Sequence, residues 1–151
     1  MSTADEKAGV RIRRARRTDA ARIAELSTQL GYPSTAQQIE ARLLRLMPRS
    51  KHAVFVAEAP GPDVVGWIHV SVANLLEIDV RAEINGLVVA EAHRSVGAGA
   101  KLLEAAEEWA RRCGCCAVNV RSNVIRERAH KFYERQGYEH YKIQKAFRRP
   151  L

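Results

Sequence analysis

The chain has 151 residues and a formal net charge of +8, a length that favours one domain with its own hydrophobic core. No stretch approaches the roughly 18 consecutive apolar residues of a membrane helix, and the polar start, residues 1–7, lacks the apolar segment of a signal peptide. We therefore expect a cytoplasmic protein without a membrane partner, with a disordered segment at 1–9 and a single domain at 10–151.

The positive charge is concentrated near the start, where five of the seven residues from Arg11 to Arg17 are arginine. Such a stretch can neutralise nucleic-acid phosphates, attract a coenzyme that carries several phosphates, or form a solvated strand edge. No helix-turn-helix, zinc-finger or RNP pattern accompanies it. A small anion is therefore favoured, and nucleic acid is not expected as a partner.

The N-terminal part predicts a strand and a helix. Residues 10–15 alternate apolar and basic side chains, which is typical of a half-exposed strand. Thr18 or Asp19 can cap a helix that ends at the turn Gly31-Tyr32-Pro33.

A second helix and a hairpin follow. Ser34 and Gln37 have the spacing of a capping box, and Pro48 stops the helix that they begin. Residues 53–58 and 64–73 are strand-like runs joined by a turn rich in proline and glycine, which predicts an antiparallel hairpin.

The central stretch predicts a strand at 83–89, a glycine-containing loop at 94–99 and a helix whose apolar face begins at Leu102. Gly114 ends that helix. The first amides of a helix have no intrahelical partner and carry a partial positive charge, and glycine lets an anion approach the backbone. This junction therefore predicts a phosphate-binding site.

The C-terminal part predicts a strand at 117–121, then a helix that Gly137 ends, and two short closing strands at 138–141 and 143–147. The resulting order is βααβββαβαββ. It predicts an α/β (α+β) domain with a mixed, mainly antiparallel sheet of about seven strands and four flanking helices.

Three cysteines, Cys113, Cys115 and Cys116, lie within four positions. Two of them have CxxC spacing, but a structural zinc site needs a second pair of ligands and a thioredoxin-like site needs its own βαβ unit. Neither context is present. We interpret the cysteines as small packing residues and expect no metal.

The glycine loop can be assigned by its spacing. It lacks the GxxxxGK[ST] pattern of a P-loop, and a dinucleotide site needs a small residue where Leu102 stands and an acidic one near Asn119. The pattern Arg94-x-x-Gly97-x-Gly99 resembles the R/Q-x-x-G-x-G/A signature of the GNAT superfamily of N-acetyltransferases. The alternative is a helix start with two glycines for a tight turn.

A second motif supports this resemblance and lies further along the chain. Asn123 and the segment 129–138, AHKFYERQGY, resemble the family's N…A..FYE..GF/Y motif. The two motifs stand in the family's order with the expected elements between them. The resemblance covers nearly the whole chain and implies a GNAT fold for residues 10–151.

The resemblance implies acetyl-CoA as the acyl donor. Its pyrophosphate would lie on the glycine loop, and its pantetheine arm along the central strand, with Asn123 as a side-chain contact and an amide near Val88 available to the thioester oxygen. The cofactor-binding residues implied in this way are Leu87, Val88, Val89, Arg94, Ser95, Val96, Gly97, Ala98, Gly99, Ala100, Asn123 and Tyr133.

The resemblance also implies two catalytic residues. Tyr133 matches the tyrosine that protonates the leaving thiolate, and the ordinary pKa values of about 10 for tyrosine and about 8.5 for a thiol make this transfer feasible. Glu83, eleven residues before Arg94, matches the general base of histone acetyltransferases. His69 or water alone are the other candidate bases, and an ordinary exposed charge is the alternative interpretation of Glu83.

The acceptor is expected to be a small-molecule primary amine: an aminoglycoside-like sugar, a polyamine or a basic peptide. The candidate contacts are Tyr32, Trp67, His69, Glu77 and Asp79, and the acidic ones among them would attract a cation, although a solvated loop would also explain them. A non-catalytic acyl-CoA sensor on the same fold is the rival function. Homodimers are common in this family, so a homodimer is the assembly to test.

Overall fold

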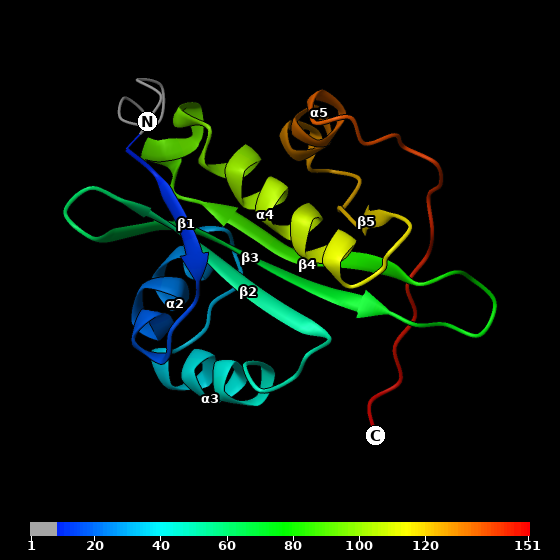
Figure 1. Ribbon diagram of the computed structural model, residues 1–151, viewed down its shortest axis with the longest axis horizontal. Helices are drawn as coiled ribbons and strands as arrows, with labels where there is room; N and C mark the ends of the chain where they lie inside the picture. The colour runs from blue at the N-terminus through cyan, green and yellow to red at the C-terminus, as the bar shows by residue number, and fades with distance from the viewer. Residues whose placement is uncertain (1–8) are drawn as a thin grey trace. The chain divides into compact units, whose positions relative to one another are not determined.

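The computed structural model describes residues 9–151, which divide after Arg121 into two compact units (Figure 1). The predicted disordered segment therefore lies outside the described residues, apart from Gly9. The prediction of one domain over 10–151 stays a prediction. The first unit contains β1 (Arg11–Arg14), η1 (Arg17–Asp19), α2 (Ala20–Gln29), α3 (Ala36–Leu46), β2 (His52–Ala59), β3 (Asp63–Ala73), β4 (Arg81–Val89), η2 (Glu91–Val96), α4 (Ala98–Arg112) and β5 (Val118–Val120). The second contains α5 (Glu127–Arg135).

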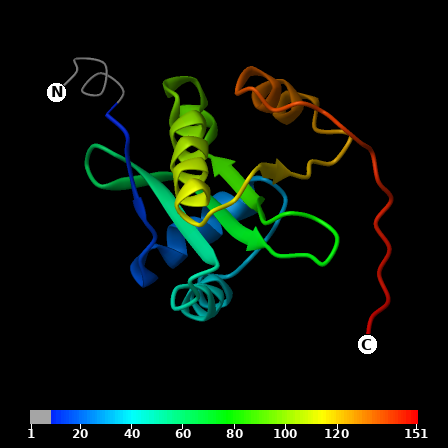
Figure 2. The same cartoon turned by 45° about the vertical axis from the view of Figure 1, so that its right-hand side comes forward.

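One five-stranded sheet organises the first unit, in the spatial order β1-β2-β3-β4-β5. The first four strands are antiparallel to their neighbours, and β5 runs parallel to β4. In Figures 1 and 2, α4 lies on one face of the sheet and α2 and α3 lie on the other. The predicted mixed sheet, the hairpin and the four α-helices are confirmed. None of the described helices is both long and apolar enough to cross a membrane.

The close approach of α4 to the sheet depends on Gly66 of β3. A Cβ atom at this position would lie 2.8 Å from the Val88 carbonyl oxygen and 3.1 Å from Cδ1 of Leu102. Both distances are shorter than ordinary contacts, so a side chain here would push α4 outward. Gly66 therefore marks the face of β3 that α4 covers.

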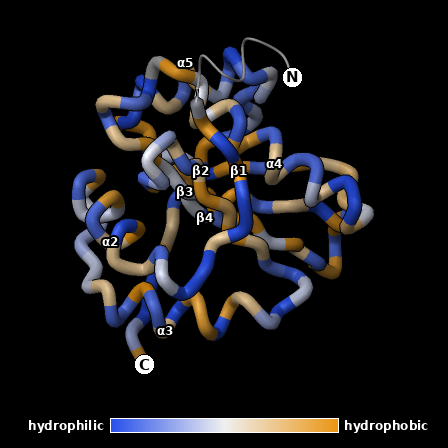
Figure 3. The backbone as a smooth tube through the Cα atoms, turned by 60° about the vertical axis from the view of Figure 1, so that its left-hand side comes forward, coloured by the Kyte–Doolittle hydropathy of each residue, from blue (hydrophilic) through white to orange (hydrophobic). Residues whose placement is uncertain are grey.

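The core lies between the sheet and its helices. Its largest fully buried side chains are Leu26, Ile68, Leu102, Leu103, Val56, Val65 and Val70. Each contributes roughly 1.5–3 kcal/mol by leaving water. Figure 3 shows hydrophobic stretches gathered in the central strands, whereas β1 is largely hydrophilic because it carries three arginines.

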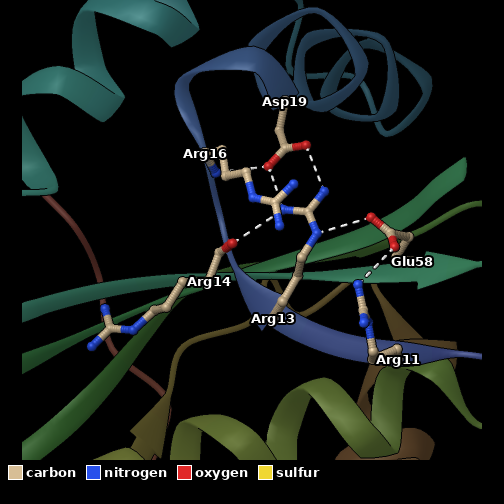
Figure 4. Close-up of polar contacts among 6 residues, drawn as sticks. All are labelled: Arg11, Arg13, Arg14, Arg16, Asp19 and Glu58. Atoms are coloured by element: carbon tan, nitrogen blue, oxygen red, sulfur yellow. Dashed lines mark hydrogen bonds and ion pairs between the residues drawn. The ribbon is translucent and has the colours of Figure 1, made fainter. Parts of the chain in front are cut away.

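Figure 4 shows how the arginines of β1 are paired. Arg13 contacts both oxygens of Asp19, at 2.8 and 2.9 Å, and its Nε lies 2.9 Å from Glu58 Oε2. Arg11 also reaches Glu58, at 3.2 Å, and Arg17 pairs with Glu40 at 2.7 Å. Three of the five arginines in this stretch are thus engaged with carboxylates of the same unit.

Asp19 occupies the N-cap position of α2, one of the two positions expected, but its side chain makes no capping hydrogen bond. Its carboxylate accepts the Arg16 N–H at 2.7 Å and binds the guanidinium of Arg13. Burial alone would raise the pKa of Asp19, but these hydrogen bonds outweigh it and the pKa lies below its usual value. A charged partner competes successfully with the helix amides for a single carboxylate.

The capping box of α3 lies one residue later than predicted. Thr35 Oγ1 accepts the Gln38 N–H at 3.1 Å, and Gln38 Oε1 accepts the Thr35 N–H at 3.0 Å. Both Ser34 and Thr35 can act as caps and both are followed three residues later by glutamine, so the sequence pattern alone was ambiguous.

The two closing strands predicted at 138–141 and 143–147 are wrong. Residues 138–151 have no regular secondary structure, so the sheet has five strands and not seven. The apolar side chains of this segment are exposed, and Phe147 is 91% exposed. Alternating apolar residues form a strand only when a neighbouring strand pairs with them, and no described strand does so here.

Candidate active site

The glycine loop lies at the junction between β4 and α4. The Ala90 N–H donates to the Val65 carbonyl at 2.7 Å and fixes the end of β4 to β3. The chain then makes the 3₁₀ turn η2 and reaches Gly97, whose φ of +81° is left-handed. Only glycine adopts this conformation readily, and here it redirects the chain into α4.

The start of α4 suits an anion. Gly97 provides no capping side chain, and the first turn contains no acidic residue. The amides of Ala98, Gly99 and Ala100 belong to this first turn and not to a loop, because the helix begins earlier than predicted. Their unpaired N–H groups and the helix dipole favour a phosphate at this end.

Arg94 lies in η2, directly before this helix start. Its Nε is 3.4 Å from the Val89 carbonyl oxygen, so the side chain lies along the end of β4. Ser95 and Val96 complete η2. The structure therefore brings together the predicted loop, residues 94–100, and the predicted strand residues 87–89.

The edge of β4 facing β5 is open along the predicted coenzyme-binding residues. The two strands pair only from Ala82–Val118 to Ile84–Val120. Beyond Ile84, no strand of the described residues pairs with β4 on this side. Alternate N–H and C=O groups of residues 85–89 thus have no described partner strand on this side, and an extended ligand could form strand-like hydrogen bonds with them.

Polar side chains gather on the face of the sheet that α4 does not cover. Because Gly66 faces α4 and side chains alternate along a strand, Trp67, His69 and Ser71 lie on the opposite face. Glu83 pairs with Ser71 in the register, and Asn85 Nδ2 donates to Ser71 Oγ at 2.8 Å. The structure thus places both predicted bases on one face.

Trp67 lies across Gly86 of β4. A Cβ atom at Gly86 would lie 2.6 Å from Cη2 of the indole, so the ring needs the space that glycine leaves. The indole Nε1 is buried and has no hydrogen-bond partner among the described residues. A buried, unpaired donor carries a penalty of about 1–3 kcal/mol, which a bound ligand could remove.

His69 contacts a second histidine, His52 of β2. His52 Nδ1 lies 3.0 Å from His69 Nε2, and the two rings stack with centroids 5.3 Å apart. Burial lowers the pKa of His69 to about 4, and His52 adds to that lowering. His69 is therefore neutral at physiological pH.

Glu83 is less free than the sequence suggested. Its Oε1 lies 3.0 Å from Arg81 Nε, and the carboxylate side chain is only 16% exposed. One oxygen is therefore engaged with a cation from the same strand.

The predicted acidic residues Glu77 and Asp79 line a cavity of about 640 Å³. It lies between the loop that precedes β4 and the start of β5, and Arg81, Cys116 and Asn119 also border it. Tyr32 lies elsewhere, in the link between α2 and α3, and is 60% exposed. No group of three His, Cys, Asp or Glu side chains within residues 9–151 is placed to hold a metal ion.

The second unit carries Asn123 and Tyr133. Asn123 Oδ1 accepts the Ile125 N–H at 3.2 Å, which forms a turn ahead of α5. The ring of Tyr133 contacts Phe132 and Tyr138, with centroid distances of 5.3 and 5.8 Å. Burial raises the pKa of Tyr133 although Arg126 opposes this, so its hydroxyl keeps its proton at neutral pH.

The sequence missed two histidines. His52 gave no signal, because its partner His69 lies 17 positions away and only the pairing of β2 with β3 brings them together. His93 precedes Arg94 in η2, and its Nδ1 is buried without a hydrogen-bond partner among the described residues. Their positions became visible only in the folded chain.

Comparisons with known proteins identify the family and the fold. The family described as "Acetyltransferase (GNAT) family" matches residues 18–138. An aminoalkylphosphonate N-acetyltransferase of Salmonella typhimurium is 37% identical over 87 residues, which are 56% of this chain and 56% of that protein. The match thus spans about half of that relative's length.

Two further comparisons extend over most of the chain. An uncharacterized N-acetyltransferase of Bacillus subtilis is 29% identical over 136 residues, covering 85% of this chain and 89% of that protein. The solved structure of an aminoglycoside N-acetyltransferase in complex with CoA superposes with a TM-score of 0.83 at 19% identity, covering 94% and 95% of the two chains. At this low sequence identity, the similarity to the solved structure shows a shared fold.

Proposed function

Because the chain belongs to the acetyltransferase (GNAT) family and is an N-acetyltransferase of that family, we propose that it moves an acetyl group from acetyl-CoA to a primary amine of a small molecule, by direct transfer in a ternary complex. One observation carries the proposal: the uncapped start of α4 adjoins the open edge of β4. An anion site beside unpaired backbone groups suits a ligand with a pyrophosphate and an extended amide arm.

The residues of this junction fit the coenzyme. The amides of Gly97, Ala98, Gly99 and Ala100 would bind the pyrophosphate, and the open edge of β4 at 87–89 would pair with the pantetheine arm. Bound acetyl-CoA would supply the activated acetyl thioester. The amide of Val88 would support its carbonyl oxygen as negative charge develops there.

The transfer requires two proton movements. The amine nitrogen forms a bond to the acetyl carbon as the carbon–sulfur bond breaks, so the amine loses a proton and the thiolate gains one. We assign Tyr133 as the proton donor to the thiolate, since its raised pKa keeps it protonated. The base lies on the face of the sheet that carries Trp67, His69 and Glu83.

The acceptor class follows from charge. Glu77 and Asp79 border the 640 Å³ cavity at the start of β4 and β5, and two carboxylates would attract a cationic amine. The relatives named above act on aminoalkylphosphonates and aminoglycosides. We infer an aminoglycoside-like, polyamine-like or basic peptide amine, with Trp67 Nε1 and the exposed Tyr32 as further contacts.

The proposal is tested by calorimetry with acetyl-CoA, followed by a screen of amines for release of the coenzyme thiol. We expect binding, and thiol release with at least one amine. Folded protein that gives no binding heat would contradict the coenzyme assignment. Binding without thiol release for any amine would favour the non-catalytic acyl-CoA sensor.

The acidic cavity has its own test. We expect the double variant Glu77→Gln/Asp79→Asn to raise KM for cationic amines roughly tenfold, because two attractive charges are lost, and to leave KM for acetyl-CoA unchanged. Equal turnover of an amine panel by the variant and the parent would exclude this cavity from acceptor binding.

A further inference from the structure

We propose that His69 and His52 form a proton relay, in which His69 takes a proton from the acceptor amine and His52 passes one to a separate cavity. The inference rests on the proposed function, since it requires an amine acceptor on the face of the sheet opposite α4. Its starting observation is the direct contact of the two imidazoles, with His52 Nδ1 3.0 Å from His69 Nε2.

The position of His69 fits a base for this reaction. His69 pairs with Gly86 in the register of β3 and β4, and Trp67 pairs with Val88. His69 is thus next to the stretch of β4 whose other edge is open for the coenzyme arm. Its neighbour Trp67 presents a buried, unpaired N–H on the same face.

The protons can be counted through the pair. In the working tautomer, His69 Nε2–H donates to His52 Nδ1, which leaves His69 Nδ1 with a free lone pair. The substrate ammonium gives a proton to His69 Nδ1, and the Nε2 proton of His69 moves to His52 Nδ1. His52 then releases its Nε2 proton to water, and one proton has left the acceptor. After the product leaves, His69 Nδ1 gives its proton to water, the Nδ1 proton of His52 returns to His69 Nε2, and His52 Nε2 takes a proton from water, which restores the working tautomers.

Burial explains why two rings are required. The burial that lowers the pKa of His69 to about 4 makes a lasting positive charge on this ring unfavourable. When His69 gains a proton at Nδ1, it must therefore lose the proton at its Nε2. The hydrogen bond to His52 provides that exit without a charged His69.

A second cavity lies at the far end of the relay. It has a volume of about 260 Å³, and Arg14, Leu46, Met47 and His52 are among its lining residues. It differs from the acidic cavity at Glu77 and Asp79, with which it shares no lining residue. Water in this cavity can accept the proton away from the reacting amine.

Several charged residues lie near the pair in the sequence or the sheet, among them Lys51, which directly precedes His52. Arg14 of β1 borders the same cavity as His52. Glu83 of β4 lies on the same face but is bound to Arg81. The buried residues of α2, which packs over β3, carry no charge: Ala20, Ile23, Ala24, Leu26 and Ser27.

The tautomer can be tested without any acceptor. Long-range ¹H–¹⁵N correlation spectra of the full chain should show His69 protonated at Nε2 and bare at Nδ1 at pH 7. Protonation of His69 at Nδ1 would overturn the relay, because no lone pair would then face the substrate. This readout does not depend on acetyl transfer, so it separates the relay from the proposed function.

Kinetics test the roles of the two rings. With 2-aminoethylphosphonate and kanamycin as acceptors, we expect His69→Gln to lower kcat/KM for the amine about 100-fold at pH 7. The parent rate should level off above neutral pH, whereas the variant rate should keep rising as free amine forms. We expect KM for acetyl-CoA to be unchanged and His140→Gln, at an exposed position, to match the parent.

His52 requires a test of positioning. We expect His52→Ala to lower kcat/KM about tenfold and added imidazole to restore part of it, which a purely structural role would not allow. Glu83→Gln should keep the pH profile of the parent. If Glu83→Gln and not His69→Gln changes that profile, Glu83 is the base and the relay is wrong. If the parent acetylates neither acceptor, the proposed acceptor class is wrong, and the tautomer spectra alone decide whether the relay exists.

Discussion

The guanidinium of Arg13 joins two carboxylates from different elements, Asp19 of η1 and Glu58 of β2. Asp19 is nearly inaccessible, at 6% exposure, and its charge depends on this partner. The hydrogen bond to Asp19 raises the pKa of Arg13, and the hydrogen bond from Arg13 lowers the pKa of Glu58. One side chain thus fixes the start of α2 against the edge of the sheet.

Removing this side chain should destabilise the fold. We expect Arg13→Met to lower the free energy of unfolding by about 2–4 kcal/mol, because the buried carboxyl group of Asp19 would lose the cation that compensates its burial. Arg11→Met is the matched control, since Arg11 is 71% exposed, and should change it by less than about 1 kcal/mol. Urea unfolding measures both, and equal effects would contradict this account.

His69 makes stability depend on pH. An unfolded histidine has a pKa of about 6.5, and burial lowers it to about 4 in the folded chain. Between these two pKa values the unfolded state binds more protons than the folded state. The stability that the buried, neutral His69 contributes is therefore fully present above pH 6.5 and is lost as the pH falls toward 4. Between pH 7 and pH 4.5, we expect the free energy of unfolding of the parent to fall by on the order of 2 kcal/mol more than that of His69→Gln. Urea unfolding at the two pH values measures both.

Tyr133 supplies a third prediction at this scale. We expect Tyr133→Phe to lower kcat by roughly ten- to a thousandfold with little change in coenzyme affinity, because the ring stays and only the acidic proton is lost. Steady-state kinetics combined with calorimetry measures both quantities. An unchanged kcat would remove Tyr133 from the mechanism.

The two ends of α4 illustrate the element scale. Gly97 precedes the helix with φ of +81° and Gly114 follows it with φ of +79°, and neither has an atom within 4 Å of an added Cβ. Both glycines therefore allow the backbone to adopt a left-handed conformation at an end of the helix. Only the first adjoins the amides that we assign to the pyrophosphate.

Alanine at either position should therefore have the same effect on folding and different effects on binding. We expect Gly97→Ala and Gly114→Ala each to destabilise by about 1–2 kcal/mol, the penalty of a left-handed residue with a side chain. Only Gly97→Ala should weaken acetyl-CoA binding, about tenfold or more by calorimetry, since it disturbs the anion site. Equal acetyl-CoA affinities of the two variants would exclude this helix start as the phosphate site.

At the scale of the whole molecule, the net charge is +8, but the arginines at 11–17 are less available to phosphates than the sequence suggests. Arg11, Arg13 and Arg17 are each paired with a carboxylate. A stretch in which three of five arginines are paired with carboxylates releases fewer counterions from DNA than five unpaired arginines would. The structure therefore weakens the case for nucleic-acid binding without any appeal to family.

This leads to a prediction for the full chain on immobilised DNA. We expect retention to be lost by about 0.15 M salt, because non-specific contacts through the other lysine and arginine side chains are screened there. Retention that persists above this salt concentration, and that coenzyme A does not displace, would indicate a nucleic-acid surface after all.

The sequence by itself determined the helices, five of the strands and the position of the candidate phosphate loop. The apolar periodicities at 53–58, 64–73 and 102–113 were long and regular, and Gly97 and Gly114 have conformations that few other residues adopt. These signals are local, because each depends only on residues within a turn or a strand. For the same reason the sequence located the acidic residues that border a cavity, although it placed the start of α4 too late.

The tertiary structure decided which residues meet. His52 and His69 face each other only because β2 pairs with β3, and Arg13 reaches Asp19 and Glu58 only across elements. The segment 138–147 failed as strands for the same reason: its alternation was correct, but pairing depends on a neighbouring strand. Contacts between distant residues depend on register and packing, and neither is written in a local pattern.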